Sequence, residues 1–288
     1  MQAPSGSMPR RAASTVNGLH RMILHHRLNS SRLVVLLQQW ARDDGARAGP
    51  TAAQPPAQPD VAEQLSQWLG PVDAVKLSRA LHAIEALPYE AAAADRLGAP
   101  LDVPAVARFF ETTKTELTTL LTAGIAPAKP LRARADNTSA QAPDPQAEAD
   151  FSAHGPRYLD LQRQMDTRLL ALRAQMRHAL TKGSVALRQL VTLDAVMEQM
   201  LGAREQRMWA SLPGQLERRF VHRQHKHQQR LQASGAADEP LRWRQPGGWL
   251  WAFEQDLQAL LLAELQVRLQ PITGLLEAAQ QENTGLQE

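Results

Sequence analysis

A dense basic segment, from Arg218 to Arg230, is the feature of this 288-residue sequence most suited to binding chemistry. It holds five Lys or Arg residues and three His residues, and no acidic residue. Such a run can attract anions, and imidazole groups can also ligate metals. His222 and His225 share a helical face as i and i+3 neighbours, whereas His227 lies well off it. Zinc takes three or four ligands, so this pair predicts no metal site.

Two interpretations of the basic segment stay open. A charge run is usually a solvated helix end, but residues 204–230 could instead bind nucleic acid or acidic lipid headgroups without sequence preference. The segment lacks the interleaved aromatic residues and recognition-helix context that would favour nucleic acid. Its candidate interaction residues are Arg218, Arg219, His222, Arg223, Lys226 and Arg230.

A second cluster holds half of the six tryptophans, Trp243, Trp249 and Trp251, around the turn Pro246-Gly247-Gly248. Large aromatic side chains at a helix start usually anchor the preceding loop, but exposed ones form hot spots for a partner. A glycine pair beside a helix can bind an anion. The Lys and Ser/Thr that would follow in a phosphate loop are missing here.

Sequence motifs for catalysis are absent. There is no G-x-S-x-G, H-E-x-x-H or Walker A sequence, and no pair of acidic residues has a spacing that indicates acid–base catalysis. We therefore predict a protein that is not an enzyme, with no catalytic residue and no cofactor.

The elements that position these clusters are predicted to be helices throughout. Apolar residues with 3/4 spacing mark a helix that Gly155-Pro156 opens and Gly183 stops. Ser184 is expected to cap a second helix that Gly202 closes, and a third follows from about Ala203 to Ala233, kinked or restarted at Pro213. The last helix begins near Gly248 and is kinked or broken at Pro271. The apolar positions of the first helix are Tyr158, Leu161, Met165, Leu169, Leu172, Met176 and Leu180.

Shorter helices are predicted before residue 126. The first spans about 19–41, and the second begins at the cap Asp60. Gly70-Pro71 starts a third, and Asp102 caps a fourth that carries Phe109, Phe110 and Leu117. The expected apolar residues of the third are Val72, Val75, Leu81 and Ile84. No run alternates with period two, so the fold class is all-α: an elongated bundle of long helical hairpins.

Two stretches rich in Pro and Ala, about 43–59 and 126–150, are predicted to be disordered linkers. They divide the chain into a basic N-terminal helix plus linker (1–57), a small helical segment (58–125), a linker (126–150) and a long-helix bundle (151–288). The heptad-like stripe at 158–180 can pack within the chain or form a homodimeric coiled coil.

Charge is segregated along the chain. Residues 151–232 hold fourteen Lys or Arg against six Asp or Glu, and residues 233–288 hold three against eight. Pairing between the basic helices and the acidic last helix is the simplest explanation. The chain has no Cys, and its longest apolar runs are about five residues, far short of the roughly 20 that span a bilayer. We expect a cytoplasmic protein.

Several stretches resemble the proteobacterial family called Domain of Unknown Function 3348. The most specific are Q-W-L followed by D-A-V-x-L-S within Val61–Leu81, and L-A-E-L-x-x-R-L-Q-P-I-x-G-L-L-E within Trp251–Ala278. The other matching stretches are Leu28–Leu37, Arg157–Ala174 and Thr192–Arg219. The resemblance implies no activity and no site residue. It implies an association with membrane proteins that resemble proton channels, and with OmpA-like proteins.

These observations together lead to one main expectation. The chain is a non-enzymatic helical adaptor or scaffold that binds a protein partner, and the resemblance implies a bacterial, cytoplasmic accessory at the inner membrane. The alternative is nucleic-acid binding through 204–230.

Overall fold

The computed structural model describes residues 31–45, 70–86, 101–123 and 147–285. Within these ranges the regular elements are six α-helices and three short 3-10 helices, without a strand. The predicted all-α fold is confirmed. The chain divides into two compact units, Met1–Gln64 and Leu65–Glu288. The predicted helix that starts at Asp60, and most of both predicted linkers, lie outside the described residues.

The first unit contains helix α2 (Arg32–Gly45). Leu33 and Trp40, seven residues apart on one helical face, are buried, whereas Val34 and Val35 are exposed. The predicted helix ends at 41, but α2 continues to Gly45, and the part predicted before residue 31 is outside the described residues.

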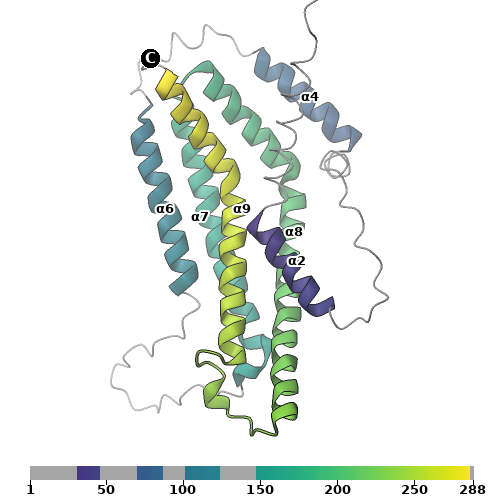
Figure 1. Ribbon diagram of the computed structural model, residues 1–288. Coiled ribbons are helices and arrows are strands. Elements are labelled where there is room, and N and C mark those ends of the chain that lie inside the picture. Colours follow the sequence, from purple (N-terminus) through teal and green to yellow (C-terminus); the bar gives the residue numbers. More distant parts are fainter. Residues whose placement is uncertain (1–30, 46–69, 87–100, 124–146, 286–288) are drawn as a thin grey trace, which may run out of the picture. The chain divides into compact units, whose positions relative to one another are not determined.

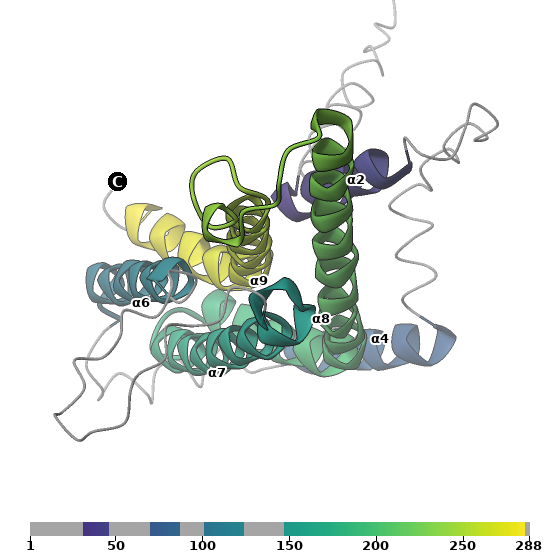
Figure 2. The same ribbon diagram turned by 90° about the horizontal axis from the view of Figure 1, so that it is seen from below.

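The second unit contains a bundle of four helices: α6 (Val103–Ala123), α7 (Gly155–Leu180), α8 (Val185–Ser234) and α9 (Trp249–Gly285). Figures 1 and 2 show α6, α7 and α9 side by side, and α9 also packs against α8. Helix α4 (Pro71–Glu85) packs on α8. The segments 58–125 and 151–288, which the linker separates in sequence, therefore contribute helices to one unit.

Helix α7 supplies one wall of the core. All seven apolar residues predicted from its 3/4 spacing are buried, and Tyr158, Met165 and Leu180 have no exposed surface. The predicted start at Gly155-Pro156 is confirmed, because Pro156 stands in the first turn, where a missing N–H costs nothing. The predicted cap of the next helix is also confirmed: the Leu187 amide donates to Ser184 Oγ at 3.2 Å.

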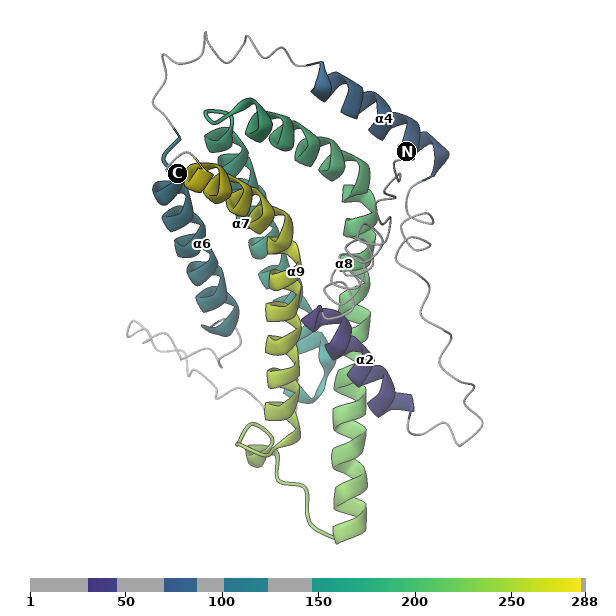
Figure 3. The same cartoon turned by 45° about the horizontal axis from the view of Figure 1, so that its top comes forward.

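Helix α8 corrects the prediction that Gly202 ends one helix and Ala203 begins another. It runs through both Gly202 and Pro213 for 50 residues and ends at Gly235, whose left-handed backbone (φ 66°) caps it. Glycine alone is a weak stop signal, because packing against neighbours readily outweighs its low helix propensity. Figure 3 shows that α8 bends along its length, and Gly and Pro are the residues that permit bends.

The interior position of Pro213 is compensated from a neighbouring helix. Proline has no amide hydrogen, so the carbonyl four residues earlier, at Trp209, loses its helical donor. The side-chain amide of Gln162, on α7, donates to the Trp209 carbonyl at 3.4 Å. This bond replaces the missing one, and it explains how α8 continues past a residue that ordinarily ends a helix.

The glycine inside α8 gives a prediction about stability. A Cβ on Gly202 would meet nothing within 4 Å. We therefore expect Gly202→Ala to raise the free energy of unfolding by about 0.5–1 kcal/mol, because alanine loses less backbone entropy in a helix. Urea unfolding followed by circular dichroism measures the change. A loss of stability would contradict the continuous helix at this position.

Helices α4 and α6 begin as predicted. The Gly70 amide donates to Asp73 Oδ2 at 3.2 Å, and the Ala105 amide donates to Asp102 Oδ1 at 2.9 Å. The predicted apolar face of α4 is wrong in part. Ile84 is buried, but Val72, Val75 and Leu81 are exposed. Val72 and Leu81 lie on opposite sides of the helix, so one packing surface could not cover both.

Helix α9 begins at Trp249, next to the predicted start, and continues through Pro271 to Gly285. Of the two predicted effects of Pro271, a kink or a break, the break is absent. The end of the predicted linker differs from expectation. The last residues of the predicted linker 126–150 form the 3-10 helix η2 (Ala147–Ala149), and η3 (Phe151–Ala153) follows it. The Gln224 side chain donates to the Ala149 carbonyl at 3.1 Å, which attaches this end of the linker to α8.

Candidate functional site

The basic segment of α8 faces the first turns of α9. Arg219 and Arg223 both donate to Asp256 Oδ2, each at 2.7 Å, and Arg223 donates a second bond to Oδ1 at 2.9 Å. Arg219 is buried and Arg223 is partly buried. These contacts agree with the expected pairing of basic α8 with acidic α9. Two of the five cations of the segment therefore pair with a carboxylate inside the protein, which weakens the case for nucleic-acid binding along the whole segment.

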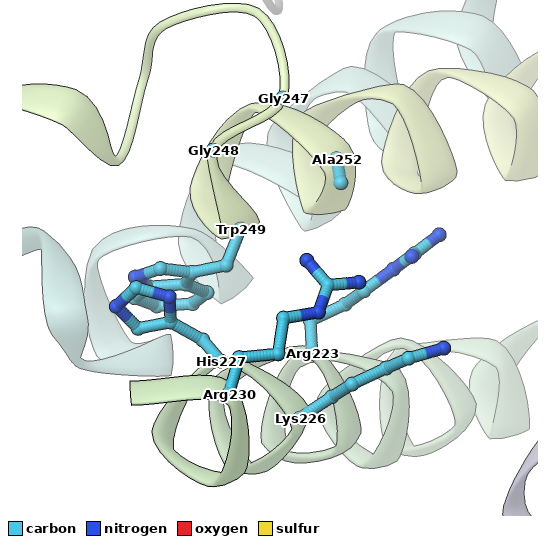
Figure 4. A pocket seen from close by; sticks show the side chains of 8 residues that line it. All are labelled: Arg223, Lys226, His227, Arg230, Gly247, Gly248, Trp249 and Ala252. Atoms are coloured by element: carbon cyan, nitrogen blue, oxygen red, sulfur yellow. The ribbon is translucent and has the colours of Figure 1, made fainter. Parts of the chain in front are cut away.

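The three remaining cations, Arg218, Lys226 and Arg230, are exposed. Lys226 and Arg230 line a pocket of about 110 Å³ together with Arg223 and His227. The opposite wall is the Gly247-Gly248 turn and the first turn of α9 (Figure 4). Positions 223, 226 and 230 fall on one helical face, so their spacing of three and four is the sequence signal for this convergence. Arg218 does not line the pocket.

His227, the histidine predicted to lie off the common face, contacts a carboxylate and a tryptophan ring. Its Nε2 lies 2.9 Å from Asp238 Oδ1, and its ring stacks on Trp249 at 6.2 Å between centroids. Trp243 Nε1 donates to the same carboxylate oxygen at 2.7 Å. Desolvation raises the pKa of Asp238, but these two hydrogen bonds outweigh it and hold that pKa below its usual value.

Two of the three clustered tryptophans are buried, and the third is partly exposed. Trp243 and Trp249 are buried, and their rings pack at 5.6 Å between centroids. Of the candidate interaction residues, these two and Arg219 therefore hold the fold together and are not exposed to a partner. Trp251 is 37% exposed. His222 and His225 are half-buried on α8. The loop before α9 includes the 3-10 helix η4 (Pro240–Arg242).

Gly248 is required by the close approach of two backbone segments. The Trp251 amide donates to the Trp243 carbonyl at 3.0 Å, and a Cβ on Gly248 would lie 2.1 Å from that same carbonyl oxygen. Gly247 has φ 91°, a backbone conformation that favours glycine. The glycine pair thus allows the backbone at Trp243 to lie against the start of α9. This role in the fold does not depend on a ligand.

A buried polar network in the bundle has no motif that marks it in the sequence. Glu264, on α9, has no exposed surface, and Tyr158 and Gln162 of α7 each donate to it at 2.9 Å. Arg268 Nη2 lies 2.6 Å from Glu264 Oε1, and Arg268 Nη1 donates to Asp166 at 2.7 Å. Burial, reinforced by the charge of Glu264, raises the pKa of Tyr158 well above its usual range. The i, i+4 pair Glu264/Arg268 was the available signal.

A second polar cluster closes the end of the bundle where η3 meets α9. The His154 ring is buried against Phe220 and Phe253, with centroids 5.5 Å and 5.2 Å away. His154 Nε2 lies 3.0 Å from the Glu148 carbonyl, which can only accept, so Nε2 carries the proton. Arg244 bridges Glu148 at 2.7 Å and Glu254 at 3.4 Å. Burial lowers the pKa of His154 and raises that of Glu254.

This cluster gives a prediction for the pH dependence of stability. Since the pKa of His154 is lower in the folded protein than its usual 6.5, the unfolded chain takes up the proton first. Its contribution to stability is complete above pH 6.5 and is lost as the pH falls. Glu254 acts in the opposite sense, because its raised pKa adds stability at low pH that fades above its usual 4.5.

We therefore expect the free energy of unfolding to fall between pH 7 and pH 5.5, where His154 dominates. The variant His154→Gln, whose amide can donate to the Glu148 carbonyl but does not titrate, should show a smaller slope in that range. Urea titrations at four pH values measure both slopes. Equal slopes for the two proteins would contradict a buried neutral His154.

None of the helices within the described residues is long and apolar enough to cross a membrane. Over the same ranges, no group of three or more His, Asp or Glu residues lies close enough together to hold a metal ion.

Comparison with known proteins identifies the family. No curated protein and no solved structure matches significantly. A family model described as "Protein of unknown function (DUF3348)" matches residues 21–281, nearly the whole chain. This match confirms the family resemblance seen in the sequence, and the chain belongs to the DUF3348 family of proteins of unknown function.

Proposed function

We propose that this protein is a non-enzymatic helical adaptor that binds a protein partner through the outer face of α4. The observation that carries the proposal is a pair of exposed valines, Val72 and Val75, which are 67% and 51% exposed. They are i and i+3 neighbours, so they form one apolar strip along the helix. Such a strip, flanked by the exposed cations Lys76 and Arg79, has the composition of a docking surface.

The opposite face of α4 is fixed to the bundle. Asp73 accepts a 2.8 Å bond from Arg204 of α8, which with the Gly70 amide lowers the pKa of Asp73. Gln189, also on α8, donates to the Ile84 carbonyl at 3.1 Å. Because one face is held by these contacts and by buried Ile84, the valine strip stays directed outward.

A groove beside the strip adds to this surface. It has a volume of about 380 Å³ and lies between α4 and α8. Its lining combines charged, polar and apolar side chains: Asp73, Lys76, Ala80, Val196, Gln199 and Met200. A groove of this kind between two helices accommodates the apolar face of a partner helix, with methionine as an adaptable contact.

The rest of the bundle supports a scaffold role. Arg173 and Arg177 of α7 share Asp194 and Glu198 of α8, with four contacts of 2.6 to 3.3 Å. These charges join α7 to α8. We propose that this scaffold is cytoplasmic and lies at the inner membrane, with a channel-like membrane protein as the partner, as the association of the family suggests.

Site-specific photo-crosslinking in native cells tests the proposal. A photoreactive amino acid replaces Val72 or Val75, and a third protein carries it at Leu241, an 80% exposed residue distant in sequence from α4. We expect the same partner to be joined at positions 72 and 75 and to be absent at 241. The purified partner should then bind the wild type, and Val72→Asp/Val75→Asp should weaken that binding at least about tenfold, since charges disrupt an apolar contact.

Two results would overturn the adaptor proposal. One is the absence of any protein adduct at 72 and 75, and the other is equal affinity of the wild type and the double variant. Circular dichroism of the double variant checks that it folds, as expected for substitutions at exposed positions.

A further inference from the structure

The pocket between α8 and the Gly247-Gly248 turn has a strongly one-sided charge. Its eight lining residues include three permanent cations, Arg223, Lys226 and Arg230, and no Asp or Glu. Figure 4 shows that all three side chains come from α8: Arg230 extends toward Gly247, Gly248 and Ala252, whereas Arg223 and Lys226 extend alongside the helix. A concave site lined by one sign of charge concentrates ions of the opposite sign.

Charge balance around the pocket leaves an excess of cations. Asp256 accepts from both Arg219 and Arg223 and does not line the pocket. Lys226 and Arg230 make no ion pair with another residue of the described parts of the chain. Asp238 is occupied by His227 and Trp243 and does not line the pocket. Neighbouring cations repel one another, so an anion in this pocket would relieve an unfavourable interaction.

The three cations of the lining suit a phosphate group, whose charge of about −1.5 to −2 exceeds that of a carboxylate. Arginine presents a planar fork of donors that suits phosphate oxygens, and lysine adds a mobile point charge. The glycine turn forms the opposite wall of the pocket, and Gly247 is exposed there. A cavity needs about 10–15 Å³ of such space to hold one water, so a pocket of about 110 Å³ has room for one tetrahedral oxyanion.

We propose that this pocket binds a phosphate group, held by Lys226 and Arg230 with Arg223 behind them. The phosphate belongs either to a small soluble compound or to a lipid headgroup, since both offer the same tetrahedral anion. This site is separate from the proposed partner surface on α4, and it stands whether or not α4 binds a protein.

Calorimetric titration of the full chain with inorganic phosphate and with pyrophosphate, at constant ionic strength, tests the site. We expect saturable binding at one equivalent and a rise in the melting temperature relative to chloride. The double variant Lys226→Gln/Arg230→Gln should bind at least about tenfold more weakly. Arg218→Gln is the matched control, because it removes an exposed cation from the same helix but outside the pocket, and its affinity should equal that of the wild type.

Sedimentation with vesicles identifies the source of the phosphate. Binding to phosphatidylcholine vesicles that contain phosphatidic acid, lost in the double variant and displaced by pyrophosphate, supports a lipid headgroup. Pyrophosphate binding without vesicle binding supports a soluble compound. The proposal is overturned if neither probe binds, or if the double variant and the Arg218→Gln control lose affinity equally. Binding of an oligonucleotide without any binding of phosphate or pyrophosphate would also overturn it, in favour of an extended electrostatic surface.

Discussion

Arg268→Leu is expected to lower the free energy of unfolding by about 3–5 kcal/mol, the cost of leaving a buried charge without its partner. The uncompensated group is Glu264, which has no exposed surface and lies 2.6 Å from Arg268 Nη2. The substitution also removes the bond to Asp166 and the stacking of the guanidinium on Trp209, 4.5 Å from the ring centroid. Urea unfolding of the purified variant measures the loss.

The matched control is Arg163→Leu, on α7. Arg163 forms an exposed ion pair with Asp160 at 3.7 Å, so its replacement should cost no more than about 1 kcal/mol. A similar loss in both variants would mean that the buried network does not form.

A double-mutant cycle measures the coupling between Glu264 and Arg268 directly. The stability loss of Glu264→Gln/Arg268→Leu should be smaller than the sum of the losses of the two single variants, because without the Glu264 charge the Arg268→Leu substitution no longer leaves a buried charge unpaired. Additive losses would contradict a direct interaction between Glu264 and Arg268.

Gly248→Ala is expected to destabilise the protein by at least about 2 kcal/mol, because backbone strain or displacement is the only way to accommodate the added methyl group. Its Cβ would lie 2.1 Å from the Trp243 carbonyl oxygen and 2.4 Å from the Arg242 carbonyl oxygen. The displaced loop would weaken the Trp251–Trp243 backbone bond and the packing of Trp243 on Trp249. Urea unfolding gives the stability, and tryptophan emission reports the loop.

Gly274→Ala serves as the control for this substitution. Gly274 lies inside α9, where a Cβ would meet nothing within 4 Å, so alanine should be neutral or stabilising there. If Gly248→Ala were as stable as Gly274→Ala, the close approach of the two backbone segments would be wrong. Since Gly248 also lines the pocket, the phosphate titration of this variant reports whether the turn positions the site.

The sequence by itself determined the helices and the side of α7 that faces the core. Seven apolar residues at 3/4 spacing all proved buried, because they form one continuous stripe and packing that side of the helix against the core removes all of them from water. The starts at Ser184 and Asp102 were equally predictable, since each side chain caps an amide three residues away. The start at Gly155-Pro156 was predictable because proline favours the first turn of a helix. These features depend on contacts local in sequence, so no knowledge of the tertiary fold is needed to find them.

The tertiary structure decided what happens where local signals are weak or ambiguous. Gly202 was predicted to end a helix and Pro213 to kink or restart one, but α8 passes through both. Gln162 of another helix replaces the hydrogen bond that Pro213 cannot make. Val72 and Val75 were predicted to be apolar core residues. Both are exposed, because α8 does not cover the side of α4 on which they lie.

The candidate site shows the same division between local and distant contacts. The sequence identified the basic segment and the tryptophans. It could not show which cations form ion pairs within the fold and which are left to bind a ligand. Asp256, more than 30 residues away in the chain, neutralises Arg219 and Arg223, whereas Lys226 and Arg230 remain beside the glycine turn. The physical reason is that a charge acquires its role from the oppositely charged groups near it in space, and for these residues only the packing of α8 on α9 determines which groups those are.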